Sequence, residues 1–327
     1  MDIRILSFED IASLGIAVSD VIGVVETGFR LKGEGKVELP AKIGIHPRND
    51  CHIHAMPCYV SAEMDVAGIK WVSGYAINRA KGLPYISGIM CLNDPETGFV
   101  KAIMDANWIT AWRTGAATGV CASYMADPDS ATVAIIGLGV QGRTNTVALA
   151  NTLLGLKTVK AFDINPDQFE RYANLVRQDL KNIEIISCKT VEEAVRGADV
   201  IVTCTAIVAN PERFVHADWL KENSLTVAVD YDTSFDADVM SGADVFVCDD
   251  INQYIGTQDQ GIHFQKGYPG RDGISGDMGG LCAGKFKIPI NGRRGAVLMG
   301  IASHDVLTAD LVYRRAVEKG IGKIIQI

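Results

Sequence analysis

The stretch that decides the fold is Ala131-Thr-Val-Ala-Ile-Ile-Gly-Leu-Gly-Val-Gln-Gly142. Its first half is a short apolar run typical of a buried strand, and its glycine-rich half leads into an expected helix over residues 141–156. The first glycine permits a tight turn, and the second lets backbone N–H groups approach a pyrophosphate at the positive end of the helix. An ordinary turn can carry the same glycines, so the surrounding sequence has to show whether this turn belongs to a dinucleotide site.

A second strand with a terminal carboxylate follows this turn. The run Val159-Lys-Ala-Phe-Asp163 ends in an acid where a dinucleotide site needs one. A carboxylate at that place accepts hydrogen bonds from the adenine ribose hydroxyls and repels a 2′-phosphate. The next residues, Ile164-Asn-Pro166, offer no cation that would hold such a phosphate. The sequence therefore predicts NAD, rather than NADP, as the cofactor.

Strands and helices continue to alternate beyond this point. We expect strands over residues 158–163, 184–188 and 200–205, with helices over 166–180 and 191–197. Alternation at these lengths is typical of a doubly wound sheet of parallel strands, which should extend to about residue 295. The fold class predicted for this half of the chain is α/β.

The first 105 residues follow a different pattern. One helix is expected over 7–31, and strand-like runs are expected over 36–45, 51–60, 67–74, 85–92 and 98–104. Turn signals such as Asn93-Asp-Pro-Glu-Thr-Gly98 separate these runs, which indicates an antiparallel sheet or barrel. Two further helices, over 107–125 and 302–319, are expected to join the domains, so the first domain is discontinuous.

Composition and charge exclude several classes of protein. The chain has 327 residues, of which 48% are hydrophobic and 21% charged, as in globular proteins of two domains. Its net charge of −8 and the lack of a basic block exclude a nucleic-acid partner. An export signal is not visible, and no apolar run approaches the ~20 residues that span a bilayer. We expect a cytoplasmic protein with no membrane partner, whose eight scattered cysteines are reduced.

Histidines and cysteines gather in the segment Cys51-His-Ile-His-Ala-Met-Pro-Cys58. In a strand, His52, His54, Met56 and Cys58 share one face and Cys51 points to the other. Zinc uses such ligands, but no pair stands at the usual spacing of a metal site, so we expect no metal. A structural role and a pocket-lining role for His54 both remain open.

Further motifs stand in a fixed order along the chain. They are Met56-Pro57, Gly68-Ile-Lys70, Leu92-Asn-Asp94, Met104-Asp-Ala-Asn-Trp-Ile-Thr-Ala-Trp-Arg-Thr-Gly115, Gly137-Leu-Gly-Val-Gln141, Gly300-Ile-Ala-Ser-His-Asp305, Tyr313 and Gly320-Ile-Gly322. In this order and spacing the chain resembles the ornithine cyclodeaminase/mu-crystallin family over nearly its whole length. The resemblance implies a Rossmann domain over residues 126–299. It also implies a discontinuous α+β domain for substrate binding and dimerisation, over residues 1–125 and 300–327, in a homodimer.

The resemblance also implies an activity. Members of the family move hydride between NAD(P) and the α-carbon of an amino acid or its imine. Lys70 matches the family's active-site lysine, Arg113 its carboxylate-binding arginine and Asp232 its catalytic aspartate. A guanidinium suits an α-carboxylate, and a carboxylate can hold an amine proton. The structural alternatives are that Lys70 is an exposed strand lysine, that Arg113 forms an interdomain ion pair, and that Asp232 is a turn or cap residue.

Two positions depart from the family's pattern. Where cyclodeaminases carry an arginine after a proline, this chain has Pro40-Ala-Lys42, and where the ornithine enzyme has an acid it has His54. The change at His54 removes the partner of a distal ammonium, so ornithine and lysine become doubtful substrates. A distal carboxylate or a compact side chain is tolerated, with Lys42, Arg48 and His54 as possible contacts.

Three functions follow from these observations. The first is an NAD-dependent amino-acid dehydrogenase or imine reductase, the second a cyclodeaminase that recycles its NAD, and the third a nucleotide-dependent binding protein like mu-crystallin. The expected catalytic residues are Lys70, Asp232 and Arg113, and the expected substrate contacts are Lys42, His54, Met56, Lys70 and Arg113. The expected cofactor contacts are Gly137, Gly139, Val140, Gln141, Asp163, Thr205, Thr114, Tyr85 and Ser87, the last two beside the nicotinamide.

Overall fold

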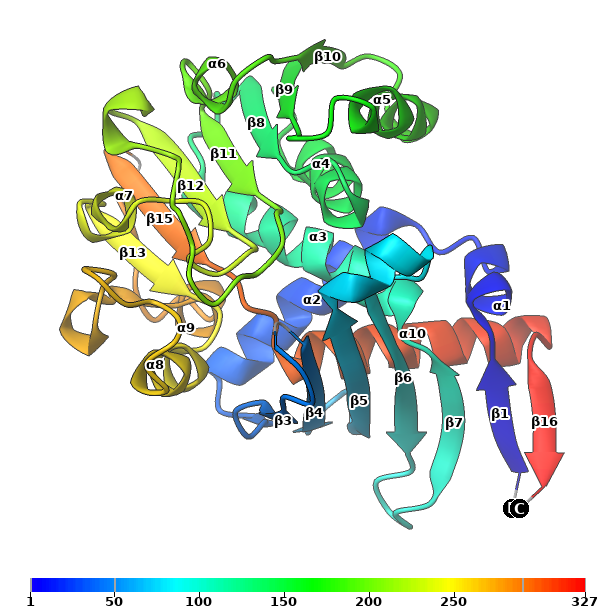
Figure 1. Cartoon of the computed structure of the whole chain (residues 1–327). Helices are drawn as coiled ribbons and strands as arrows, with labels where there is room; N and C mark the ends of the chain where they lie inside the picture. The colour runs from blue at the N-terminus through cyan, green and yellow to red at the C-terminus, as the bar shows by residue number, and fades with distance from the viewer. Residues whose placement is uncertain (1, 50, 290, 327) are drawn as a thin grey trace. The chain divides into compact units, whose positions relative to one another are not determined.

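The chain divides into two compact units, each built around one sheet. The structure is a computed structural model that describes residues 2–49, 51–289 and 291–326. The first unit runs to Arg113 and resumes at Gly300, and the second comprises Thr114–Met299. Figure 1 labels the elements of both units.

The sheet of the first unit is mixed but mainly antiparallel. Its described strands are β1 (Asp2–Leu6), β2 (Val37–Glu38), β3 (Ile43–Ile45), β4 (Cys51–Val60), β5 (Val66–Tyr75), β6 (Ile86–Asn93), β7 (Val100–Asp105) and β16 (Lys323–Gln326). They lie in the order β16-β1-β7-β6-β5-β4-β2, and β3 pairs with β4. Strand β1 runs parallel to β7, and the other pairs described are antiparallel.

Two boundaries predicted for this unit are wrong. The single helix expected over 7–31 is two helices, α1 (Phe8–Ser13) and α2 (Val18–Gly33), because Gly15 takes a left-handed φ of +65° that ends the first. The single strand expected over 36–45 is β2 and β3, separated around Pro40, whose nitrogen cannot donate to a strand ladder.

Helices cover one face of this sheet. The helix α10 (Ala302–Lys319) packs on β4, β5 and β6 and against α2, and a short 3₁₀ helix, η1 (Ala76–Lys81), connects β5 to β6. The strand period places Lys70 and Val72 on the buried face, while Trp71 and Ile89 point the other way. Those two side chains are 47% and 46% exposed. The second face of the sheet therefore carries exposed apolar side chains in the single chain.

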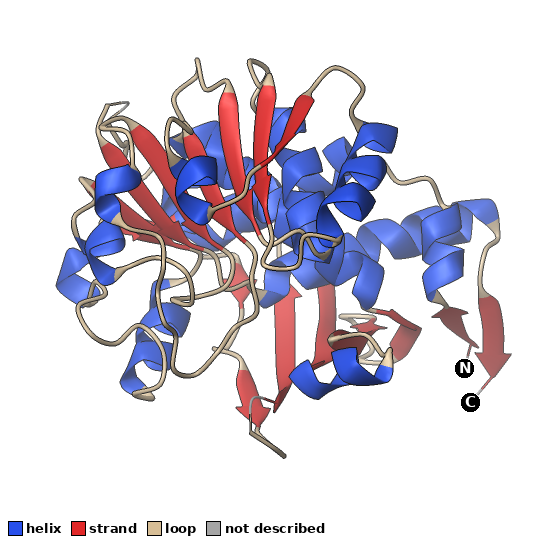
Figure 2. Cartoon of the chain, turned by 45° about the horizontal axis from the view of Figure 1, so that its top comes forward, coloured by secondary structure: helices blue, strands red, loops and turns tan. Residues whose placement is uncertain are grey.

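The sheet of the second unit is parallel throughout the part of the chain that is described. Its strands are β8 (Thr132–Ile136), β9 (Thr158–Phe162), β10 (Glu184–Ser187), β11 (Val200–Thr203), β12 (Ser224–Ala228), β13 (Val245–Cys248), β14 (Gly276–Asp277) and β15 (Arg293–Val297). Their order is β10-β9-β8-β11-β12-β15-β13-β14. This confirms the doubly wound α/β architecture. Figure 2 shows these strands flanked by helices.

The helices of the second unit follow the strands in alternation. They are the end of α3 (Asn107–Met125), α4 (Val140–Thr152), α5 (Gln168–Asp179), α6 (Val191–Val195), α7 (Ala237–Ser241), α8 (Ile251–Asp259), α9 (Met278–Cys282), η2 (Ala217–Trp219) and η3 (Arg271–Gly273). Successive strands are added on one side of β8 up to β10, and from β11 onward on its other side, so the strand order changes direction between β8 and β11. Ligands of such sheets bind outside the carboxyl ends of the strands at this point.

Two further facts bear on the expected setting of the protein. Among the helices in residues 2–49, 51–289 and 291–326, none is both long and apolar enough to cross a membrane. All eight cysteines carry free thiols.

Candidate functional site

The glycine-rich turn has the geometry of a dinucleotide loop. Gly137 follows β8 with a φ of +94°, and a Cβ on it would lie 2.7 Å from the Cys204 carbonyl oxygen. A Cβ on Gly142 would lie 2.2 Å from the Gly137 oxygen, so the first turn of α4 packs directly on the loop. Around Gly139, apart from its own atoms and those of its two chain neighbours, no heavy atom of the described residues lies within 4 Å of an added Cβ. The middle glycine thus leaves open the space through which a phosphate would approach.

Asp163 lies against this turn from the end of the neighbouring strand. Its Oδ2 accepts a 2.8 Å hydrogen bond from the Leu138 N–H, and its Oδ1 accepts one of 2.9 Å from the Asn165 N–H. The side chain follows β9 directly and is only partly buried. The predicted pairing of turn and carboxylate is therefore present in space, with lone pairs of the carboxylate left for ribose hydroxyls.

Other predicted cofactor residues lie around the same strand ends. Val140 begins α4 and is 67% exposed, and Gln141 follows it. Thr205 follows β11 and donates its hydroxyl to Asp230 at 2.6 Å. Asp230 also accepts hydrogen bonds from Thr203 and Ser234, so it ties together the loops after β11 and β12. Sequence reasoning did not assign this role to Asp230.

The first unit contains a buried ion cluster that the sequence predicted only in part. Lys70 on β5 and Arg113 on α3 both bind Oδ1 of Asp305 on α10, with the Nζ–Oδ1 and Nε–Oδ1 distances both 2.8 Å. The side chains of Lys70, Arg113 and Asp305 are 1%, 7% and 0% exposed. The structural alternative for Lys70, an exposed strand lysine, is wrong. The sequence analysis did not assign a role to Asp305. An acid among apolar residues in the first turn of a helix indicates a carboxylate that is buried with a cationic partner.

The cluster has one more cation than anions when both bases are protonated. Burial lowers the pKa of Lys70, the nearby Arg113 lowers it further, and Asp305 only partly opposes them, so that this pKa is about 7. Burial raises the pKa of Asp305, but Arg113 and Lys70 outweigh it and hold the pKa below its usual value. Asp305 therefore stays ionised, and the excess charge suits an anionic ligand such as a carboxylate.

Arg113 is placed by a close approach of the backbone. Gly300 has a φ of +82°, and a Cβ there would lie 2.3 Å from Nη1 of Arg113. A residue with a side chain would displace the guanidinium, so the glycine that begins the C-terminal segment fixes the orientation of the arginine. Thr114, the next residue of α3, is buried and belongs to the second unit.

The histidine segment lies on the same face of the sheet as Lys70. Met56 on β4 pairs with Lys70, is 3% exposed, and has His54 two residues away on its face. The His54 ring stacks on His52 with ring centres 4.3 Å apart. Burial, with Lys42 and His52 next in effect, lowers the pKa of His54 to about 3. His54 is thus neutral, and the described groups that lower its pKa besides burial are lysines and other histidines. No group of three or more metal-binding side chains occurs in the described part of the chain.

Ser87 lies on the other face of the sheet. It pairs with Ser73, their hydroxyl oxygens are 3.0 Å apart, and the strand period places both residues opposite to Lys70. Tyr85 precedes β6, and its carbonyl accepts a 2.9 Å hydrogen bond from the Tyr75 N–H. Ser87 therefore faces away from Lys70, and the place of Tyr85 and Ser87 beside the nicotinamide stays a prediction.

Asp232 lies in a network within the second unit. Its Oδ2 accepts hydrogen bonds from Nη2 of Arg213 at 2.8 Å and from the Phe264 N–H at 2.9 Å, and its Oδ1 is 3.1 Å from Nδ1 of His263. Burial raises the pKa of Asp232, but the hydrogen bonds from His263 and Arg213 outweigh it and lower the pKa. Sequence reasoning missed Arg213 and His263, which stand in loops without a motif.

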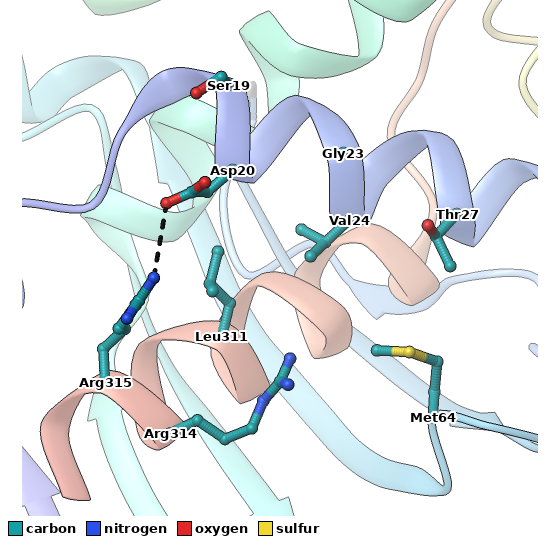
Figure 3. A pocket seen from close by; sticks show the side chains of 9 residues that line it. All are labelled: Ser19, Asp20, Gly23, Val24, Thr27, Met64, Leu311, Arg314 and Arg315. Carbon is teal, nitrogen blue, oxygen red and sulfur yellow. Dashed lines mark ion pairs between the residues drawn. The ribbon is translucent and has the colours of Figure 1, made fainter. Parts of the chain in front are cut away.

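A separate hollow of about 430 Å³ lies between α2 and α10 (Figure 3). Its arginines are paired, since Arg314 binds Asp310 at 2.8 Å and Arg315 lies 4.0 Å from Asp20. None of the predicted site residues lines it. The hollow therefore offers neither unbalanced charge nor the residues of the predicted chemistry.

Comparison with known proteins agrees with this geometry. The model of the ornithine cyclodeaminase/mu-crystallin family matches residues 2–320. The chain belongs to this family. The nodulation efficiency protein NfeD of Rhizobium meliloti is 33% identical to this family member over 327 residues, 99% of this chain and 98% of that protein. The resemblance inferred from the motifs is confirmed.

Two solved structures share the whole fold with this family member. An archaeal alanine dehydrogenase dimer with bound NAD is 30% identical, with 100% of both chains covered and a TM-score of 0.88. The Δ¹-pyrroline-2-carboxylate reductase of Thermococcus litoralis, in complex with NADH and L-proline, is 28% identical. The match covers 98% of this chain and 100% of that one, with a TM-score of 0.88. The expected Rossmann sheet with a second α+β unit is thereby confirmed.

Lys70 should make carboxylate binding depend on pH. Because its pKa is about 7, its ammonium is present below that pH and lost above it, while Arg113 stays charged. The Kd of a monocarboxylate such as pyruvate, measured by calorimetry, should rise about tenfold from pH 6 to pH 9, since a lost charge-assisted hydrogen bond costs about 1.5 kcal/mol or more. The variant Lys70→Met should bind weakly at both pH values. A wild-type Kd that does not change over this range contradicts the assignment.

Proposed function

We propose that this protein is an NAD-dependent oxidoreductase that transfers hydride between the nicotinamide and the α-carbon of a small L-amino acid or its imine. The observation that carries the proposal is the buried Lys70–Asp305–Arg113 cluster, with its excess positive charge, in a chain that also has a dinucleotide turn. The two solved relatives support it, since both hold a nicotinamide dinucleotide and one also holds L-proline.

The first unit supplies the ligands of the α-carboxylate. Arg113 presents a planar fork of donors, and the Lys70 ammonium adds a point charge, so that a carboxylate is held at both oxygens. Asp305 fixes the two cations at a common oxygen and leaves one positive charge for the substrate. Orientation of the bound amino acid by these groups removes the entropic part of the barrier.

The second unit supplies the cofactor site. The turn of Gly137 and Gly139 is open to a pyrophosphate, and Asp163 stands where the adenosine ribose would bind. We assign Val140, Gln141, Thr114 and Thr205 to the walls of the same site. When bound, NAD accepts a hydride from the substrate or returns one to its imine.

The substrate contacts favour a small or acidic side chain over a basic one. His54 is neutral, and the groups that lower its pKa after burial are Lys42, His52, His46 and Lys70. A distal ammonium would meet the positive charges of Lys42 and Lys70 there, and no acid of the described residues is among the groups that lower the pKa of His54. This observation disfavours a cyclodeaminase acting on a diamino acid.

We also propose that the protein is a homodimer. The open face of the first unit's sheet carries Trp71 and Ile89, with Ile69 and Cys91 in the adjoining cross-strand pair. A patch of exposed apolar side chains of this kind marks an interface. The dimeric alanine dehydrogenase relative supports the same assembly.

A paired assay tests the proposed reaction. Purified protein with NAD⁺ and a panel of L-amino acids, including ornithine and lysine, should form NADH and ammonia in equal amounts with a small or acidic amino acid. Arg113→Lys keeps the charge but loses the fork, so kcat/KM should fall about a hundredfold. The surface variant Arg196→Gln, which breaks exposed contacts with Glu192 and Asp218, should leave it unchanged.

Two results of this assay contradict the proposal. Ammonia without accumulation of NADH would mean a cyclodeaminase. Binding of amino acids with no turnover across the panel would mean a binding protein. Circular dichroism of Arg113→Lys separates a lost contact from a lost fold, because Asp305 retains Lys70 as a partner in that variant.

The cofactor assignment predicts the behaviour of Asp163→Ser. Removing the carboxylate removes its hydrogen bonds to the ribose and its repulsion of a 2′-phosphate. The ratio of kcat/KM for NADP to that for NAD should rise by about tenfold or more, equivalent to ~1.4 kcal/mol. Asp167→Ser, at an exposed carboxylate on the same loop, is the matched control. An unchanged ratio in Asp163→Ser argues against the role of this residue.

The dimer assignment predicts the behaviour of Trp71→Glu. A charge in the centre of the apolar face should give a monomer in sedimentation at micromolar concentration, whereas the wild type sediments as a dimer. Leu154→Glu, at a residue that is 94% exposed in the second unit, should remain a dimer. A monomeric wild type would show that the face is covered in some other way.

A further inference from the structure

We propose that His54 binds a second carboxylate of the substrate, so that the favoured substrate is a short dicarboxylic L-amino acid or its imine. This inference rests on the proposed function and names the substrate class of the same site. All the groups that carry it belong to the first unit and lie on β3, β4, β5 and the segment before β3. His54 is therefore a specificity-determining residue, and His52 is a positioning residue that holds its ring.

The strand register places His54 next to the carboxylate cluster on one face of the sheet. Met56 pairs with Lys70, and the next pair on the same face joins His54 to Val72. One same-face step along a strand is about 7 Å. A ligand held by Lys70 and Arg113 at one end can thus reach His54 with its other end when a short carbon chain separates its two acidic groups.

The charges of these groups act on one another. After burial, Lys42 is the group that lowers the pKa of His54 most, and Lys70 lowers it as well. Lys42 also lowers the pKa of Lys70. The positive potential of two lysines therefore extends over the His54 ring, which stays neutral and offers an N–H as a donor. A carboxylate at this place gains both a hydrogen bond and a favourable field.

The His54 ring is held in place by glycines and by a second imidazole. Gly44, its partner on β3, leaves room for it, since a Cβ on Gly44 would lie 2.3 Å from Cδ2 of His54. Gly74, the partner of His52 on β5, leaves room for that ring in the same way, because a Cβ there would lie 2.3 Å from Cε1 of His52. The two rings stack with centres 4.3 Å apart and planes inclined by 19°. Two glycines and a ring stack therefore fix the direction of His54.

The nitrogens of His54 are not used within the described part of the chain. The side chain is only partly buried, and none of the hydrogen bonds between described residues involves its ring nitrogens. An imidazole N–H that is withdrawn from bulk water without a partner loses hydration, and a ligand that accepts a hydrogen bond restores that loss. A purely structural histidine would use its nitrogens on protein groups. The arrangement therefore favours the pocket-lining role of His54 over the structural one.

A carboxylate is the ligand that fits these surroundings best. A distal ammonium would be repelled by Lys42 and Lys70, and a methyl group would leave the His54 N–H without an acceptor. A metal ion would need further ligands, and no group of three or more metal-binding side chains occurs among residues 2–49, 51–289 and 291–326. A carboxylate uses both the N–H and the positive potential.

The first test measures binding without turnover. Succinate and butyrate have carbon chains of the same length, and a methyl group of butyrate replaces the second carboxylate of succinate. With NADH bound, the Kd of succinate measured by calorimetry should be about tenfold or more below that of butyrate, the effect of one charge-assisted hydrogen bond. Neither compound has a C=N bond to be reduced, so the result does not depend on the reaction. A wild type that binds the two equally overturns the proposal.

The decisive variant is His54→Phe. The phenyl ring keeps the stack on His52 and the place beside Gly44 but has no N–H. The preference for succinate should fall to about threefold or less, with an unchanged Kd for butyrate and an unchanged Tm. His54→Gln returns an amide N–H near the place of Nε2 and should restore most of the preference. A full preference in His54→Phe overturns the proposal.

The matched control for this variant lies in the second unit. His216→Phe makes the same substitution at an imidazole that is 45% exposed and pairs with Asp236. It should keep the full preference for succinate, because His216 belongs to neither the carboxylate cluster nor the histidine stack. A preference lost in both variants would contradict a specific role for His54.

A further variant tests the position of the ring without removing a donor. Gly74→Ala adds a methyl group whose three nearest heavy atoms all belong to the His52 ring, and Gly74 does not have a left-handed φ, so the ring has to move. We expect the preference for succinate to fall severalfold while butyrate binds as before. In the control Gly23→Ala, apart from the chain neighbours and the backbone of its own helix, no heavy atom of the described residues lies within 4 Å of the added Cβ. An unchanged preference in Gly74→Ala contradicts the positioning role of His52.

Turnover distinguishes this inference from the proposed function. In the paired assay, kcat/KM for L-aspartate should exceed that for L-2-aminobutyrate, in which a methyl group replaces the side-chain carboxylate, by about tenfold or more. His54→Phe should remove most of this difference. If the wild type prefers succinate but oxidises no amino acid, the proposed function fails while the carboxylate site stands. If it oxidises L-2-aminobutyrate as well as L-aspartate, the proposed function stands and this inference fails.

Discussion

The buried Lys70–Asp305–Arg113 cluster is the constraint on which the first unit depends. It joins β5, α3 and α10, which come from three distant parts of the chain, through one carboxylate oxygen. Burying ions in this way costs free energy that their mutual attraction only partly offsets. A cluster of three buried ions therefore contributes little to the stability of the fold. We attribute the cluster to ligand binding, because it leaves one positive charge that can pair with an anion. The apolar packing of α10 on the sheet holds the three groups in place.

The second unit also uses buried carboxylates to hold distant segments together. Asp230 ties the loops after β11 and β12, and Asp232, two residues later, gathers Arg213, His263 and the Phe264 N–H. Both aspartates follow the carboxyl end of β12, where a parallel sheet collects its functional groups. One holds the loops and the other orients an imidazole, although the two are nearly adjacent in the sequence.

Most of the fold followed from the sequence because its signals are local. The glycine turn, the alternation of β8 to β11 and the helices 107–125 and 302–319 each depend on periodicity within one segment. The strands β1 and β16 were missed, since strands of five and four residues are too short to show a period. Asp305 and His263 were also missed as site residues, because their roles arise from partners far away in sequence. The resemblance supplied Lys70, Arg113 and Asp232, but only the coordinates show that the carboxylate of Asp232 is already engaged.

The discontinuity of the first unit has a consequence for synthesis of the chain. A ribosome releases residues 114–299 before Gly300 and α10 emerge, and domains generally fold as units during translation. The second unit can therefore complete its sheet while Lys70 and Arg113 still lack Asp305. The first unit can close its helical layer only when the last segment arrives, and β16 then pairs with β1 to bring the two ends of the chain side by side. A nascent chain stalled before residue 300 would hold a complete second unit and a first unit that still lacks Asp305.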